Sequence, residues 1–196
     1  MTRRCVFLDR DGTINEEVDF LRTPEELVLV PGAASGIRKL NERSIATCVI
    51  SNQSGVARGF LQEKDLLPIH TKLQQLLQDE GGAIVDRIYY CPHHPTAGIA
   101  PYNIVCDCRK PGAGMLRRGE RELNVVLERS FVVGDRIVDI QAGKSVGATT
   151  LLVLTGYGRQ SAEECRQANI APDYIEPSLP QAVDRILEVV DKGEII

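Results

Sequence analysis

Two aspartates near the N-terminus are the residues of this chain best placed to do chemistry. Residues 5–8 are apolar, and Asp9 and Asp11 follow them with one residue between the two, just before Gly12. Alternate side chains of an extended segment share a face, so both carboxylates can reach one pocket where the glycine turns the backbone. Two crowded anions require a cation or a shared proton. The pattern predicts magnesium-assisted phosphoryl transfer, with Asp9 as nucleophile and Asp11 as general acid and base.

The Asp-x-Asp-Gly string also occurs in turns and in calcium-binding loops. A calcium loop needs a glycine at its sixth position and a glutamate at its twelfth. Counted from Asp9, those positions hold Ile14 and Phe20, which excludes the calcium loop. A simple turn remains as the structural alternative, because so short a motif needs support from other segments.

The elements that must position these aspartates alternate along the chain. Apolar runs predict strands at residues 5–8, 46–50, 84–90, 130–133 and 149–154, and helical patterns cover residues 63–79, 115–124, 139–146 and 179–190. Strands separated by helices predict an α/β, Rossmann-like parallel sheet with helices on both faces, in a single domain over residues 1–196. In such sheets the ligand lies beyond the carboxyl ends of the strands. His70, in the first of these helices, is expected to be solvated.

Polar clusters follow the second and fourth predicted strands. Residues 51–55 read Ser-Asn-Gln-Ser-Gly, and residues 134–139 contain Asp135 and Asp139. The hydroxyl of Ser51 can donate to a phosphoryl oxygen, Asp135 supplies the further carboxylate that magnesium requires, and Asp139 is expected to support the ligands from behind. Either cluster alone could be a helix cap or a turn. Both together, at the sheet edge that carries Asp9, favour a site.

A cationic pair follows the third predicted strand. Lys110 is a compact charge suited to neutralising phosphoryl oxygens, whereas the planar fork of Arg109 suits selection of a substrate group. The alternative is a solvated surface pair. The cysteine- and histidine-containing segment immediately before Arg109 and Lys110 favours a functional role for the pair.

Soft ligands cluster in the segment 91–108, which no strand or helix pattern claims. Cys91, Cys106 and Cys108 accompany two adjacent histidines, His93 and His94. Three thiolates and one imidazole form a closed tetrahedral zinc site that contributes folding energy to a loop. Spacing does not decide which histidine binds, and unliganded thiols remain the alternative. A metal on Cys108 would fix the backbone that presents the neighbouring cations.

Composition narrows the classes of partner. The chain has 196 residues, 43% of them hydrophobic, and a formal net charge of -4 without a basic stripe, which argues against nucleic acid or anionic lipid. Six cysteines, three of them between residues 91 and 108, favour metal ligation in a reducing compartment over a disulfide frame. No apolar run has the length of a signal peptide or a membrane span. We expect a cytoplasmic monomer that acts on a small molecule.

Taken in order, four groups of residues resemble the four motifs of haloacid dehalogenase (HAD) superfamily phosphatases over essentially the whole chain. They are Asp9-x-Asp11-Gly12-Thr13, Ser51-Asn52, Lys110, and Gly134-Asp135 with Asp139. Within that superfamily, residues 9–15, 51–59, 89–95 and 106–111 are similar to the D-glycero-D-manno-heptose-1,7-bisphosphate 7-phosphatase family. The spacing of the motifs leaves no room for a large cap domain, so the cap is expected to be minimal and the site open.

The resemblance implies removal of the 7-phosphate of the heptose 1,7-bisphosphate through an aspartyl phosphate. It implies Mg²⁺ on Asp9, Asp135 and the backbone carbonyl of Asp11, and structural Zn²⁺ on Cys91, His93, Cys106 and Cys108. The implied phosphoryl-stabilising residues are Ser51 and Lys110. The implied substrate-binding residues are Glu17, Val18, Asp19, Phe20, Asn52, Gln53, Ser54, Arg109 and Arg136. Arg136 stands where relatives often carry lysine, and residues 16–20 depart from the family pattern.

Two alternatives are weighed against this interpretation. Histidinol-phosphate phosphatases share the four motifs and the zinc ligands, but their loop between the zinc histidine and the next cysteine is shorter than residues 94–105 here. A phosphoaccepting receiver domain also combines acids, a lysine and magnesium in a parallel α/β fold. Receivers accept phosphate after the third strand, where this chain has Cys91, and have no need of a zinc site.

Overall fold

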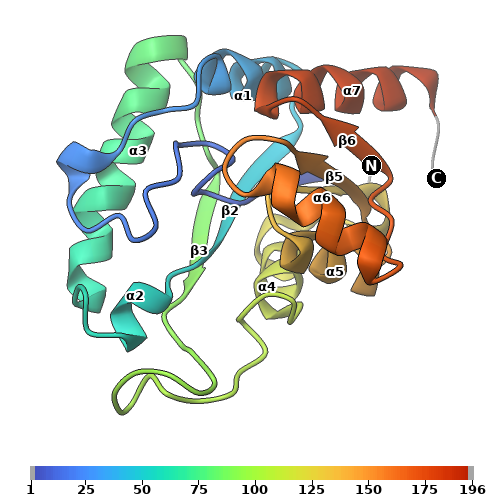
Figure 1. The fold of residues 1–196 in the computed structure, drawn as a ribbon. Coiled ribbons are helices and arrows are strands. Elements are labelled where there is room, and N and C mark those ends of the chain that lie inside the picture. The colour runs from blue at the N-terminus through green and yellow to red at the C-terminus, as the bar shows by residue number, and fades with distance from the viewer. Residues whose placement is uncertain (1–2, 194–196) are drawn as a thin grey trace.

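The computed structural model describes residues 3–193, which build a six-stranded parallel sheet between two layers of helices (Figure 1). The strand order is β3-β2-β1-β4-β5-β6, and every neighbouring pair is parallel. The strands are β1 (Cys5–Leu8), β2 (Ala46–Asn52), β3 (Arg87–Cys91), β4 (Phe131–Gly134), β5 (Thr149–Val153) and β6 (Tyr174–Glu176). The predicted α/β class and parallel sheet are confirmed.

Helices connect successive strands over this stretch. They are α1 (Ala33–Glu42), α2 (Ser54–Ala57), α3 (Leu66–Gly81), α4 (Gly114–Leu123), α5 (Ile137–Ser145), α6 (Gly158–Gln167) and α7 (Leu179–Lys192), with short 3-10 helices at Pro24–Glu26, Glu63–Asp65 and Leu127–Arg129. The segments that follow β1 and β2 contain only short helices before α1 and α3. No large cap is inserted within residues 3–193, as the spacing predicted.

Alternate side chains of β1, a central strand, point to opposite faces of the sheet and belong to two different parts of the core. Val6 and Leu8 of β1 belong to the apolar cluster covered by α1, α3 and α7, whereas Cys5 and Phe7 belong to the cluster beneath α4 and α5. Figure 1 shows α1 and α7 on one side of the sheet and α4 and α5 on the other. Because both faces of the central strands are buried, β1 and β4 are apolar, and polar side chains follow at their carboxyl ends.

Helix α3 shows how sequence sets an element that flanks the site. Its buried residues Leu66, Ile69, Leu73 and Leu77 recur at helical spacing, and the helix ends where Gly82 adopts a left-handed conformation with φ of 64°. His70 belongs to the same buried stripe, so the expectation that it is solvated was wrong. Its ring lies 5.5 Å from that of Tyr90. Burial is the main cause that lowers its pKa, to about 4, followed by the charge of Arg10.

The sequence analysis assigned no element to residues 33–42 or 174–176, where α1 and β6 lie. Buried Ala33, Ala34, Ile37 and Leu40 give α1 a helical signal that was available in the sequence. Strand β6 has three residues and lies at the sheet edge with Ile175 exposed, so it carries little pattern. The strand predicted at residues 84–90 is shorter, since Ile84 is exposed and pairing begins at Arg87. The ends of the predicted domain, residues 1–2 and 194–196, lie outside the described residues.

Candidate active site

The carboxyl ends of β1, β2 and β4 converge on one cavity of about 450 Å³. The backbone N–H of Asp9 donates to Val133 at 2.9 Å, which continues the β1–β4 pairing up to the first aspartate. The loop after β3 is joined to the end of β2 by two hydrogen bonds of 3.0 Å between Asn52 and the backbone of Lys110. Segments distant in sequence are thereby held at one sheet edge, as parallel topology requires.

Lys110 is buried between two carboxylates. Its ammonium group lies 2.9 Å from Asp9 and 2.6 Å from Asp139, and it donates to the carbonyl of Ile50 at 2.7 Å. Burial lowers the pKa of Lys110, but Asp139 and Asp9 raise it more, so the group stays charged. All three donors of the ammonium group are engaged, and its charge is directed at Asp9.

Asp135 combines with Asp9 to make a strongly acidic corner. Carboxylate oxygens of Asp9, Asp135 and Asp139 lie within 4.8 Å of one another. Burial is the largest cause that raises the pKa of Asp9 to about 7 and that of Asp135 to about 8. Oδ2 of Asp135 accepts the N–H of Tyr157 at 2.8 Å, whereas its buried Oδ1 has no hydrogen-bond partner among the described residues.

An orphaned, buried carboxylate oxygen beside a second carboxylate fits a hard divalent cation, which prefers oxygen ligands. Gly12 and Gly156 pack against the carboxylate of Asp135 in left-handed backbone conformations, with φ of 76° and 52°. A side chain at either position would overlap that carboxylate. The two glycines therefore leave the space that the Asp135 carboxylate occupies.

Asp11 faces the same cavity in a different environment. Arg10, whose side chain is fully buried, donates from Nη2 to both carboxylate oxygens of Asp11, at 3.0 and 2.9 Å. Asn15 and Gln53 donate one further hydrogen bond each, at 3.0 and 2.9 Å. Burial by itself raises the pKa of Asp11, but Arg10 and these donors lower it below the usual value. The sequence analysis missed Arg10 and Asn15, although both lie inside the motif that it quoted.

Ser51 lies at the end of β2 with its hydroxyl oriented by a neighbour. The side-chain amide of Gln53 donates to its Oγ at 2.7 Å and thus occupies an acceptor site of the hydroxyl. The Ser51 proton remains available for a ligand oxygen. Both residues line the cavity together with Asn52 and Ser54.

The other predicted substrate-binding residues divide into those that reach the cavity and one that does not. Glu17, Asp19, Phe20, Arg109 and Arg136 line it, whereas Val18 is 44% exposed and is not among the lining residues. The sequence analysis missed two polar residues of the rim, Arg58 and Tyr157, and His94, which it weighed as an alternative zinc ligand, lines the same cavity. The hydroxyl of Tyr157 contacts Asp19 at 2.5 Å and its ring lies 4.0 Å from the guanidinium of Arg136, so it joins two predicted residues.

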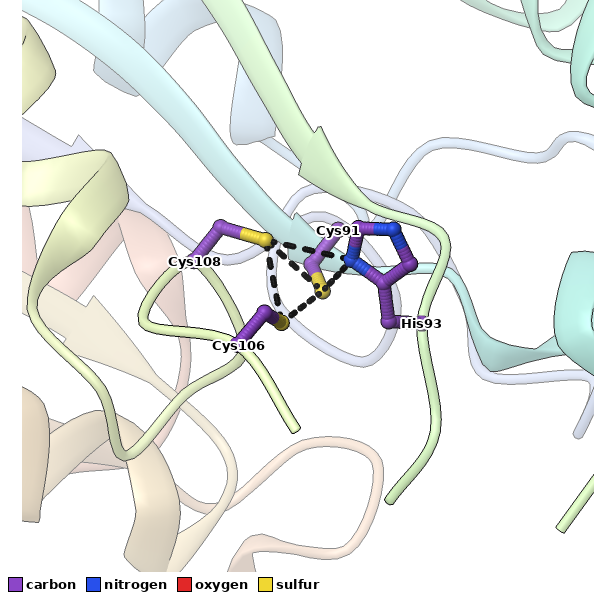
Figure 2. A group of neighbouring side chains, drawn as sticks. All are labelled: Cys91, His93, Cys106 and Cys108. Atoms are coloured by element: carbon purple, nitrogen blue, oxygen red, sulfur yellow. Dashed lines mark hydrogen bonds between the residues drawn. The ribbon is translucent and has the colours of Figure 1, made fainter. Parts of the chain in front are cut away.

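The four predicted zinc-binding side chains meet at the end of β3 (Figure 2). The sulfurs of Cys91 and Cys106 each lie 3.2 Å from that of Cys108, and Nδ1 of His93 lies 3.5 Å from Cys108 and 3.7 Å from Cys91. The edge of a tetrahedron with zinc–sulfur bonds of about 2.3 Å is about 3.8 Å. The donor set and the inward orientation of all four atoms fit zinc.

This cluster is mechanically joined to the acidic site. Cys108 immediately precedes Arg109 and Lys110, and Arg109 donates from Nη1 to the carbonyl of His93 at 3.1 Å. His94, the other candidate, points elsewhere, since its Nδ1 accepts the N–H groups of Thr96 and Ala97 at 3.3 and 3.0 Å. The structure thus separates the two adjacent histidines, with His93 facing the thiols and His94 facing the cavity.

Comparison with known proteins agrees with this geometry. The HAD-hydrolase-like family profile matches residues 107–182. A D-glycero-D-manno-heptose-1,7-bisphosphate 7-phosphatase of Thermosynechococcus vestitus is 39% identical over 95% of this chain and 96% of its own length. A D-glycero-beta-D-manno-heptose-1,7-bisphosphate 7-phosphatase of Pseudomonas putida is 40% identical over 82% of this chain and 88% of its own length.

A solved structure shows the same fold at a similar level of identity. The D,D-heptose 1,7-bisphosphate phosphatase from B. bronchiseptica, crystallised with magnesium and phosphate, superposes with a TM-score of 0.82 at 33% identity, over 94% of this chain and 98% of that one. Fold and site define a phosphatase of the HAD superfamily. More narrowly, the chain belongs to the D-glycero-D-manno-heptose-1,7-bisphosphate 7-phosphatase family. The histidinol-phosphate and receiver alternatives find no support among these relatives.

In the part of the chain that the structure covers, residues 3–193, no helix is long and apolar enough to cross a membrane.

Proposed function

We propose that the protein hydrolyses the 7-phosphate of D-glycero-D-manno-heptose 1,7-bisphosphate and releases heptose 1-phosphate. The observation that carries the chemistry is the position of Asp9, which lies at a strand end between a buried ammonium group and an acidic corner. The names of relatives that share more than a third of their residues with the chain support the substrate.

Two metal ions belong to the proposal. Asp9, Asp135 and the backbone carbonyl of Asp11 would hold Mg²⁺, for which the unpartnered Oδ1 of Asp135 is the structural support. Bound there, the ion would polarise the phosphoryl group and offset its charge. Cys91, His93, Cys106 and Cys108 would hold a structural Zn²⁺.

In the first step, a carboxylate oxygen of Asp9 attacks phosphorus in line with the ester oxygen. An Oδ–P bond forms as the P–O bond to the sugar breaks, which leaves an aspartyl phosphate. Ser51 donates to a phosphoryl oxygen. Esterification removes the negative charge that Asp9 offers to Lys110, so the donor aimed at Asp9 becomes free for a phosphoryl oxygen.

Asp11 is proposed to protonate the departing sugar hydroxyl. Arg10 keeps this carboxyl ionised in the free protein. A phosphate brought close to Asp11 opposes that effect, because a second negative charge raises the pKa of a neighbouring carboxyl. In the second step Asp11, now ionised, takes a proton from water as the water oxygen attacks the phosphorus. The Oδ–P bond breaks, inorganic phosphate leaves and the Asp9 carboxylate is regenerated. Asp139 holds Lys110 in place throughout.

Substrate recognition is proposed for the residues around the cavity entrance. Glu17, Asp19 and Phe20 approach from the segment after β1, and Asn52, Gln53 and Ser54 from the end of β2. Arg109 and Arg136 supply charge that a bisphosphate requires. Val18 is proposed to contribute through its backbone, since it is exposed and is not among the residues that line the cavity. The gathered thiols support a reducing, cytoplasmic location, and the monomeric state stays a prediction.

The proposal is tested by substrate comparison and by an Asp9→Asn variant. We expect the wild type to release phosphate from heptose 1,7-bisphosphate faster than from histidinol phosphate or fructose 1,6-bisphosphate at matched concentration. Asp9→Asn should abolish turnover, whereas Asp11→Asn should reduce it by about 10²- to 10⁴-fold. Preference for histidinol phosphate would overturn the substrate assignment and leave the proposed mechanism unaffected. Full activity of Asp9→Asn would falsify the mechanism.

A further inference from the structure

Two hydrogen-bond donors face each other at the rim of the cavity without an acceptor between them. Nδ1 of His94 accepts the N–H groups of Thr96 and Ala97, so in the neutral imidazole the proton resides on Nε2. That Nε2 lies 3.3 Å from Nη2 of Arg58, and a guanidinium has no acceptor. The contact therefore stabilises neither side chain. Both groups need a third partner, and an oxygen placed beside them would accept from each.

We propose that Arg58 and His94 form a second phosphate subsite, which binds the phosphate of the substrate that is not hydrolysed. The inference rests on the proposed function, since it assumes a sugar bisphosphate. Both residues line the cavity that contains Asp9. Oxygens of a phosphate monoester accept several hydrogen bonds at once, and its negative charge suits a guanidinium. Neither residue belongs to the set predicted from the motifs.

Backbone hydrogen bonds hold the segments that carry Arg58 and His94 next to each other. Arg58 directly follows α2, and the zinc loop docks on that helix through a hydrogen bond of 2.9 Å from the N–H of Ile99 to the carbonyl of Ala57. Gly98 permits the approach, because a side chain there would overlap the same carbonyl. The N–H of His94 also donates to the carbonyl of Tyr102 at 3.0 Å. The subsite is therefore assembled when the loop packs on α2.

The position of the pair separates it from the groups that act on the transferred phosphate. Lys110 and Asp139 are buried at the sheet edge, whereas Arg58 is exposed and His94 half-buried at the rim. The guanidinium of Arg58 lies 5.9 Å from the ring of Phe20, a loose contact that leaves it free to meet a ligand. Because Asp9 and the pair line one cavity, the proposal places one phosphate of the substrate at Asp9 and the other at the pair.

The test compares a bisphosphate with its monophosphate. Kinetics are measured for heptose 1,7-bisphosphate and for heptose 7-phosphate with wild type, Arg58→Gln and His94→Phe. Each variant should lose about 10- to 100-fold in kcat/KM for the bisphosphate, as expected for a charge-assisted hydrogen bond, and less than about 3-fold for the monophosphate. His94→Gln, which keeps a donor, should recover part of the loss.

Arg22→Gln is the matched control, because Arg22 stacks on Phe60 at 5.0 Å and is not among the residues that line the cavity. Arg22→Gln should leave kcat/KM unchanged for both substrates. Zinc content and melting temperature verify that the variants are intact. Equal losses on both substrates, or variants that match a wild type active on the bisphosphate, would overturn the subsite alone. A wild type that does not hydrolyse the bisphosphate would overturn the proposed function as well.

Discussion

Lys110 carries a buried ammonium group, which must be held by two buried carboxylates to offset the cost of removing its charge from water. Its contacts with Asp9 and Asp139 exclude water and aim a positive charge at the proposed nucleophile. Such a group stabilises the fold only in the company of its partners, because desolvation of three charges costs as much as their attraction returns. Catalysis and stability therefore depend on the same contact.

We expect Lys110→Met to lose activity and to destabilise the protein by about 3–5 kcal/mol, since it leaves two buried carboxylates without a cation. Adding Asp139→Asn to that variant should restore part of the stability. Urea unfolding measures both effects. Lys144→Met is the control, because Lys144 pairs with Asp173 on the surface and should cost less than about 1 kcal/mol. A Lys110→Met variant as stable as the control would contradict this account.

At the scale of elements, the loop between β3 and α4 connects the proposed zinc site to the catalytic edge. Cys91 ends β3, and Cys106 and Cys108 return the chain to Arg109 and Lys110. The loop has few buried apolar residues, since Ile99, Ile104 and Val105 are exposed. A metal bound at the proposed zinc site would then be the main source of order for the segment that carries Arg109 and Lys110.

Cys106→Ser should remove bound zinc and lower kcat/KM by about 100-fold, because a small displacement of Lys110 misplaces its charge. Elemental analysis and steady-state kinetics measure the two effects. In the wild type, activity lost to a chelator should return with Zn²⁺ and Mg²⁺ together, and not with Mg²⁺ alone. Cys165→Ala is the matched control, since Cys165 is buried beside α5 and away from the cluster. Zinc retained by the Cys106→Ser variant would contradict the assignment of Cys106 as a zinc ligand.

Across the whole molecule, the acidic corner links folding, metal binding and pH. Burial raises the pKa of Asp9 to about 7 and that of Asp135 to about 8. The folded protein therefore holds protons that the unfolded chain releases near pH 4, so these two groups make the metal-free protein less stable as pH rises from about 4 to 8. A divalent ion needs both carboxylates ionised and displaces those protons.

Mg²⁺ should accordingly bind at least about tenfold more tightly at pH 8 than at pH 6, as measured by titration calorimetry. The rise in melting temperature caused by a fixed Mg²⁺ concentration should follow the same order. Asp173→Asn changes a carboxylate outside the site and should leave this dependence intact. An affinity independent of pH would show that the corner is already ionised without metal.

Much of this arrangement could be predicted from sequence because its signals are local. Asp9 and Asp135 each follow a short apolar run, and parallel topology then brings strand ends together. The composition of the Cys91–Cys108 segment, rich in cysteine and histidine, was enough to predict a metal site there. What sequence could not supply depends on contacts between distant segments. The hydrogen bonds between Asn52 and Lys110 and the contact of Arg58 with His94 arise from packing between distant segments.

Asp9, the proposed nucleophile, directly follows β1, a strand that is hydrogen-bonded on both sides, to β2 and to β4. Apart from Asn52, the last residue of β2, the residues proposed to choose the substrate lie in segments that follow the strands. The proposed nucleophile is thus held rigidly by the central sheet, whereas most side chains proposed to select the substrate lie on connecting segments that can be replaced. New ester specificities should therefore be obtainable by grafting the connection after β1, with the central strands and the Lys110-bearing connection after β3 left untouched.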